Sequence, residues 1–153
     1  MSHQDFMKKA IECSAENVLL KKGGPFGALI VKDGQIIAGA CNQVLKDNDP
    51  TAHAEVSAIR KAGQVLGTFD LSGCDLYTSC EPCPMCLMAS KWANIRQIYY
   101  AATRKDAADI GFRDDDFYAL LKENTSAGVF LEECRSSAVK VMQDWQKQFN
   151  KLY

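Results

Sequence analysis

The sequence lacks long apolar runs, a secretion signal and an excess of charge of either sign. No apolar run approaches the ~20 residues that a membrane-spanning helix needs, so we expect no membrane partner. The first ten residues, MSHQDFMKKA, do not show the basic and then apolar pattern of a secretion signal, and we therefore expect a cytoplasmic protein. The net charge is −1, whereas proteins that bind nucleic acid through its phosphates usually present a basic face. A small-molecule substrate is therefore expected rather than nucleic acid.

Internal repeats, low-complexity tracts and linkers are also missing, which favours one domain over residues 1–153. The 47% hydrophobic and 24% charged residues are ordinary for a globular protein of this length. Seven cysteines is an odd number, and without a secretory context they are expected to stay reduced and in part to bind metal. Cys13, Cys41, Cys74 and Cys134 are expected to be small buried hydrophobic residues, which is common for free cysteine.

The alternation of apolar runs and helical patterns predicts the fold. Short apolar runs bounded by turn residues predict strands at residues 26–31, 35–42, 74–80, 95–103 and 129–134. Helical periodicity predicts helices at residues 2–22, 52–66, 83–92, 117–122 and 136–150, with a polar loop at 106–116. Asp33–Gly34 predicts a hairpin between the first two strands, and Ser2 with Asp5 resembles a capping box. We therefore expect a three-layer α/β/α fold, in which helices cover both faces of a mixed five-stranded sheet.

Histidine is scarce, since the chain holds only His3 and His53. His53 lies in PTAHAEV with Glu55 two residues later, and the downstream segment SCEPCPMC carries Cys83 and Cys86. Imidazole nitrogen and thiolate sulfur are zinc ligands, and catalytic zinc sites keep three protein ligands and one position open to water. The pattern predicts zinc bound by His53, Cys83 and Cys86. Glu55 is expected to take a proton from the attacking water and to return it later.

Several alternatives to this catalytic zinc site remain open. Cys80 and Cys83 also form a C-x-x-C pair, although Pro82 disfavours helical geometry before it and so favours the pair Cys83 and Cys86. Glu81 is a competing carboxylate that we interpret as a helix-start acid. A purely structural zinc site would instead close its shell with a fourth protein ligand, for which Cys80 is a candidate.

Four segments carry a resemblance to a known family. PFGALIV, NDPTAHAEV, LYTSCEPCPMC and YYAATRKDAADIGF together resemble bacterial guanine deaminases, within the superfamily of cytidine-deaminase-like zinc hydrolases. The resemblance runs over nearly the whole chain. It implies hydrolysis of guanine to xanthine and ammonia, with one zinc ion per subunit. Sister activities that remain open are deamination of cytosine, a pteridine, a triazine or tRNA adenosine.

The resemblance also implies residues that contact the purine substrate. Phe26 would stack on the ring, Asn42 would hydrogen-bond the ring edge, and Asp114 would accept hydrogen bonds from the N–H groups of the substrate. Ala54 is implied as a further substrate contact. The alternatives are a core aromatic for Phe26, a turn residue for Asn42 and a solvated acidic loop for the three aspartates at 114–116.

The C-terminal segment is the last feature that the resemblance concerns. It implies a homodimer in which residues from about 125 to 153 are swapped onto the partner subunit. Tyr153 would then close the substrate pocket of that partner, whereas the alternative is a frayed tail.

Overall fold

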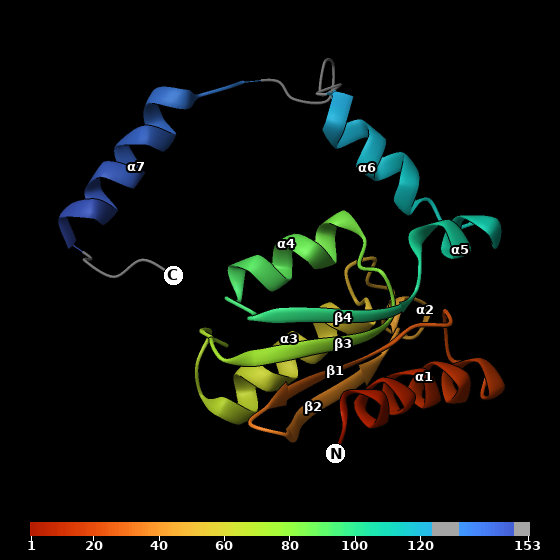
Figure 1. The fold of residues 1–153 in the computed structure, drawn as a ribbon. Helices are drawn as coiled ribbons and strands as arrows, with labels where there is room; N and C mark the ends of the chain where they lie inside the picture. Colours follow the sequence, from red (N-terminus) through yellow and green to blue (C-terminus); the bar gives the residue numbers. More distant parts are fainter. Residues whose placement is uncertain (124–131, 149–153) are drawn as a thin grey trace. The chain divides into compact units, whose positions relative to one another are not determined.

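The structure, a computed structural model, describes residues 1–123 and 132–148 (Figure 1). The chain divides into two units, Met1–Tyr118 and Ala119–Tyr153. The first unit contains, in chain order, α1 His3–Leu19, β1 Gly27–Lys32, β2 Gln35–Cys41, α2 Val44–Asp47, α3 Ala54–Leu66, β3 Cys74–Cys80, α4 Pro84–Trp92, β4 Gln97–Ala102 and α5 Arg104–Asp109. Helix α6, Asp114–Glu123, begins in the first unit and ends in the second, which also contains α7, Arg135–Gln148.

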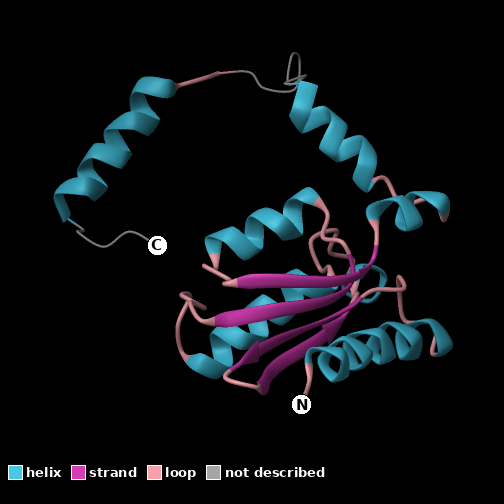
Figure 2. Ribbon diagram, viewed as in Figure 1, coloured by secondary structure: helices cyan, strands magenta, loops and turns pink. Residues whose placement is uncertain are grey.

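One mixed sheet forms the centre of the first unit, in the strand order β2-β1-β3-β4 (Figure 2). Strand β1 pairs antiparallel with both β2 and β3, whereas β3 and β4 are parallel. The α/β class and the mixed sheet are therefore as predicted. The prediction of five strands was wrong for the described residues, which form four.

Side chains alternate between the two faces of β1 and define three layers. Ala28 and Ile30 belong to the apolar cluster that packs on α3. Leu29 and Val31 point to the opposite face and pack with Phe6 of α1. Full burial of a side chain such as Ile30 stabilises the fold by about 1.5–3 kcal/mol. Helices α3 and α1 therefore cover opposite faces of the sheet.

Local sequence signals are confirmed at both the first helix and the first hairpin. Ser2 caps α1 and forms a capping box with Asp5, although the helix ends at Leu19 rather than at Lys22. Asp33 and Gly34 have φ angles of 49° and 76°, which the primed hairpin turns require.

The strand directions bring several segments to one end of the sheet. Gly27 at the start of β1 pairs with Cys41 at the end of β2. Because β1 is also antiparallel to β3, the end of β3 at Cys80 lies at this same end, and Cys80 pairs with Ala102. The residues that immediately precede β1 or follow β2 and β3 are therefore gathered together.

Other predicted elements need correction. The region expected to be a polar loop, 106–116, contains most of α5, which a capping box of Thr103 and Asp106 starts. Helix α6 begins at Asp114 rather than at residue 117. Residues 132–134 of the predicted last strand are not in a strand, and residues 129–131 lie outside the described part. Among the described residues, no helix is both long and apolar enough to cross a membrane.

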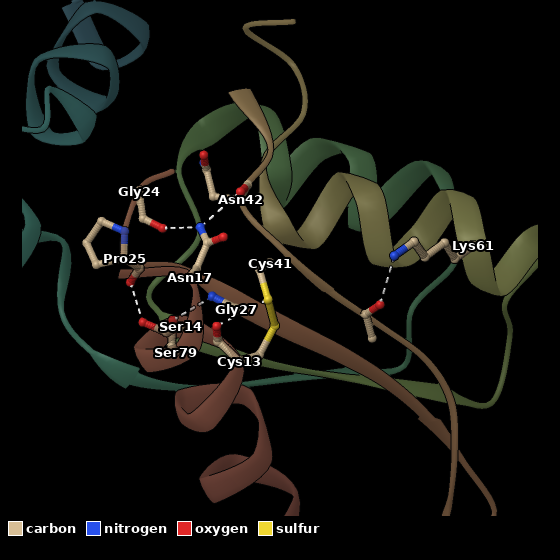
Figure 3. Close-up of a disulfide and its surroundings, with 11 residues drawn as sticks. Cys13, Ser14, Asn17, Gly24, Pro25, Gly27, Cys41, Asn42, Lys61 and Ser79 are labelled. Atoms are coloured by element: carbon tan, nitrogen blue, oxygen red, sulfur yellow. Dashed lines mark hydrogen bonds between the residues drawn. A yellow bond between two sulfur atoms is a disulfide. The ribbon is translucent and has the colours of Figure 1, made fainter. Parts of the chain in front are cut away.

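Cys13 and Cys41 form a disulfide, which corrects the expectation of two free buried cysteines (Figure 3). Packing of α1 on the sheet brings their Cα atoms to 5.8 Å, inside the range of about 4.4–6.8 Å that a disulfide needs. Sequence alone does not reveal this proximity, because it depends on how α1 crosses β2. Cys74 is buried as expected, whereas Cys134 is exposed.

Reduction of this disulfide is expected to lower the free energy of unfolding by about 2–4 kcal/mol, because the bond closes a long loop in the unfolded chain. The two cysteines are separated by 28 residues. Urea unfolding with and without a thiol reductant measures the difference. The double variant Cys13→Ser/Cys41→Ser is the control, since its unfolding should not respond to the reductant. Equal midpoints for the oxidised and reduced wild type would contradict the prediction.

Candidate metal centre

Two helix starts hold the predicted metal ligands. His53 is the N-cap residue of α3, and Cys83 is the N-cap residue of α4, with Pro84 at the first helical position. Proline is favoured there because its missing N–H would have no partner in the helix. Cys86 lies in the first turn of α4 and is fully buried. The positive ends of both helix dipoles thus face the same cluster, which favours thiolate over thiol.

The donor atoms of His53, Cys83 and Cys86 all lie within 4.8 Å of one another. His53 Nδ1 is 3.6 Å from Cys83 Sγ and 3.5 Å from Cys86 Sγ. A tetrahedral zinc with ordinary Zn–N and Zn–S bonds would set such N···S distances at about 3.6 Å. The three residues therefore fit zinc in both ligand type and spacing.

The cluster is already arranged to carry negative charge. The side chain of Cys86, and to a lesser extent that of His53, lowers the pKa of Cys83 to about 4. The neighbouring Cys83 side chain and burial raise the pKa of Cys86, whose thiol donates a hydrogen bond to Oε2 of Glu55. The hydrogen bond to Cys83 also raises the pKa of His53. Metal binding to such a cluster releases protons, because zinc needs thiolates and a neutral imidazole.

Glu55 lies directly beside this cluster. It sits in the first turn of α3 and is only 5% exposed. Its Oε1 accepts a hydrogen bond of 3.1 Å from the Thr78 hydroxyl, and its Oε2 is 3.5 Å from Cys86 Sγ. Burial is the main cause that raises the pKa of Glu55. Enzymes raise the pKa of a catalytic carboxyl by burial in this way, which suits Glu55 to a role in proton transfer.

The competing ligand, Cys80, and the competing carboxylate, Glu81, each have other partners. The Cys80 thiol donates to the backbone carbonyl of Thr103 at 3.6 Å, and burial raises its pKa to about 12. Among the residues that the structure describes, Cys80 is not part of the three-membered cluster. Glu81 accepts a hydrogen bond of 3.0 Å from the backbone N–H of Arg104. The geometry thus favours the interpretation with Cys83, Cys86 and Glu55.

A cavity of about 400 Å³ opens over His53 and Glu55. Its volume lies in the range of about 300–1,000 Å³ that is typical of small-molecule sites. Its wall is formed by segments at the end of the sheet where β1 begins and β2 and β3 end, and by residues at the start of α6. The lining residues are Gly24, Phe26, Asn42, Val44, Leu45, Pro50, His53, Glu55, Cys80, Glu81, Cys83, Phe112 and Asp114.

Residues 1–102 match the cytidine and deoxycytidylate deaminase zinc-binding region. The chain belongs to this deaminase family. It is 57% identical over 118 residues to the guanine deaminase of Bacillus subtilis, an alignment that covers 77% of this chain and 76% of that protein. It is also 40% identical over 116 residues to the tRNA-specific adenosine deaminase of Agrobacterium fabrum, covering 69% and 76%.

The crystal structure of the Bacillus subtilis guanine deaminase superposes on this deaminase with a TM-score of 0.93. That comparison covers 100% of this chain and 99% of the solved chain at 46% sequence identity. The cytidine-deaminase-like fold predicted from sequence is therefore confirmed.

The structure places three of the five predicted substrate contacts at the cavity. Phe26, Asn42 and Asp114 line the cavity, and Phe26 packs edge-on against Phe112 with ring centroids 4.7 Å apart. Ala54 is fully buried in the core cluster and is not among the described lining residues. Tyr153 lies outside the described part of the chain. Phe112 was missed by the sequence analysis, although it ends the DAADIGF segment that carries the family resemblance.

The three consecutive aspartates, 114–116, have different surroundings. Asp115 forms an ion pair of 3.2 Å with Arg104, and Asp116 is exposed. Asp114 lines the cavity, and burial is the main cause that raises its pKa. The geometry therefore favours Asp114 as the one that faces a ligand.

Proposed function

We propose that the chain is a zinc-dependent guanine deaminase, which hydrolyses guanine to xanthine and ammonia. The observation that carries the proposal is the cluster of His53, Cys83 and Cys86 with buried Glu55 beside it. The similarity to a guanine deaminase over most of both chains supports guanine as the substrate.

Glu55 performs the proton transfers in this proposal. Zinc at His53, Cys83 and Cys86 would lower the pKa of a bound water from ~15.7 toward ~7. Glu55 takes a proton from the attacking water as its oxygen bonds to C2 of guanine, and it passes the proton to N3. It then takes the second proton from the hydroxyl group now on C2 and delivers it to the amino group. The C2–N bond breaks, ammonia leaves, and the C2 carbonyl of xanthine forms. Thr78 holds the carboxyl of Glu55 in place through its hydroxyl.

The cavity supplies groups that suit a purine. The Phe26 ring offers a face for stacking, and the Asn42 amide can both donate to and accept from the ring edge. The Asp114 carboxylate can accept from N–H groups of guanine, which is a stronger interaction than a hydrogen bond between neutral groups.

Substitution of Asp114 by asparagine is expected to raise KM for guanine by about 10–100-fold, because a charged hydrogen-bond acceptor is lost. The effect on kcat should be smaller, since Asp114 does not transfer a proton in the proposal. Steady-state kinetics measure both constants. Asp115→Asn is the matched control, because Asp115 pairs with Arg104 and should leave KM nearly unchanged. An equal effect of the two substitutions would contradict the assignment of Asp114.

Ammonia release from a panel of substrates tests the proposed function, together with zinc quantification. The panel contains guanine, cytosine, a pteridine, a triazine and an adenosine-containing tRNA anticodon stem-loop. We expect the highest kcat/KM with guanine and one zinc per subunit. Higher activity on the stem-loop, with binding that weakens steeply with salt, would instead support a tRNA deaminase such as the Agrobacterium relative.

Three further statements remain predictions of this proposal. They are a cytoplasmic location, a homodimer and a swap of residues from about 125 to 153 onto the partner subunit. Light scattering coupled to size-exclusion chromatography measures the mass. Truncation before residue 125 then tests the swap, because loss of the exchanged segment should abolish activity.

A further inference from the structure

Asn17 is a buried polar residue outside the cavity that joins two segments of the cavity wall. It lies on α1 and is 4% exposed. Its side-chain amide donates a hydrogen bond of 2.8 Å to the carbonyl of Gly24 and one of 3.0 Å to the carbonyl of Asn42 (Figure 3). An asparagine amide has two donor hydrogens, so both are used in these contacts.

The two acceptors belong to segments that are distant in sequence and converge at the cavity. Gly24 precedes Phe26, and Asn42 follows β2. Gly24, Phe26 and Asn42 all line the cavity. The backbone N–H of Asn42 also donates to the carbonyl of Phe26 at 2.9 Å, which links the two segments directly. Asn17 itself is not among the described lining residues.

Close packing leaves these segments little freedom to shift. A Cβ atom at Gly23 would lie 2.9 Å from the carbonyl oxygen of Asn42 and 3.2 Å from Nδ2 of Asn17. The Ser14 hydroxyl, one turn earlier on α1, donates to the carbonyl of Pro25 at 2.7 Å. The disulfide of Cys13 and Cys41 fixes the same helix to the end of β2. Helix α1 is therefore a fixed support against which the cavity wall is held.

We propose that Asn17 is a positioning residue for substrate recognition, because its amide sets the place of Phe26 and Asn42 in the cavity wall. The inference rests on the proposed function, in which these two side chains contact the purine ring. Asn17 does not touch the metal ligands or Glu55. Its loss should therefore weaken substrate binding more than it slows the chemical step.

Substitution of Asn17 by alanine is expected to raise KM for guanine about tenfold, because two charge-neutral hydrogen bonds that order the wall are lost. The value of kcat and the zinc content should stay close to those of the wild type. Alanine is a better helix former than asparagine, so α1 itself should not be weakened. If the alanine variant does not fold, Asn17→Ser keeps one hydroxyl donor and should show a smaller rise in KM.

A double-mutant cycle with Asn42→Ala separates positioning from general stability. We expect Asn17→Ala to raise KM by a smaller factor once the Asn42 side chain is removed, because only the positioning of Phe26 is then left to lose. Asp75→Asn is the matched control, because Asp75 is a buried polar residue with two hydrogen bonds from Arg96 at the opposite end of β3. It should lower the thermal midpoint without a change in KM.

The inference would be overturned by an unchanged KM in Asn17→Ala, by fully additive effects in the cycle, or by a rise in KM that Asp75→Asn reproduces. In each comparison, the KM of the variant is divided by the KM of the wild type. Both are measured on whichever base of the substrate panel the wild type deaminates. A wild type that is inactive on guanine but active on another base would thus refute the proposed substrate and still allow the test of Asn17.

Discussion

Replacement of Glu55 by glutamine is expected to lower kcat by about 10²–10⁴-fold, the usual contribution of a positioned general acid–base. Glutamine has nearly the same shape and its carbonyl can still accept the hydrogen bond from Thr78. It cannot take a proton from water or return one to the substrate. Zinc content should therefore stay at the level of the wild type while turnover falls. Stopped assays of ammonia release, with metal analysis of the same sample, measure both.

Glu81→Gln is the comparison for this substitution. Glu81 also lines the cavity, but its carboxylate is engaged by the backbone N–H and the guanidinium of Arg104. We expect this variant to retain most of the activity. Full turnover in Glu55→Gln, or an equal loss in both variants, would refute the role of Glu55 as the proton shuttle.

Loss of the metal is expected to lower the activity at least as much as Glu55→Gln does. Cys86→Ser, or removal of zinc by a chelator, should reduce activity to below about a thousandth of that of the wild type, because water with a pKa of ~15.7 is not ionised at neutral pH. Serine cannot replace the thiolate, and the other ligands, His53 and Cys83, would then hold the cation weakly. Activity of the chelated wild type should return when zinc is added, whereas the serine variant should not recover.

The control for this experiment is Cys134→Ser, since Cys134 is exposed and is not part of the metal cluster of the described residues. Its activity and zinc content should match those of the wild type. Chelated protein that contains no zinc and remains fully active would show that the cluster has no part in the reaction.

Much of the fold could be predicted from the sequence because its signals are local. The capping box at Ser2, the Asp33–Gly34 turn and the apolar runs of the strands each act within a few residues. The disulfide could not be predicted, because it depends on how α1 crosses the sheet. Helix α5 was missed because it is short and its sequence, RKDAAD, is mostly polar and gives no apolar periodicity.

The chemistry-bearing part of the site was easier to predict than its wall. His53, Glu55, Cys83 and Cys86 occur in two short motifs, and chemistry restricts the residue types that can bind zinc. The wall instead combines side chains from several segments, so the contribution of Phe112 depends on tertiary packing. The acidic run offered three equivalent candidates. The structure distinguishes them, because Asp114 lines the cavity, whereas Asp115 pairs with Arg104 and Asp116 is exposed.

The N-cap positions of His53 and Cys83 have a consequence for folding. Neither side chain makes a capping hydrogen bond to the first turn of its own helix. A cation bound by both side chains would link the N-termini of α3 and α4. It would stabilise these helix ends in place of the capping serine or aspartate that other helices use. The same ion would thus serve both catalysis and structure. A chain without it would lose order at the starts of these two helices as well as its activity.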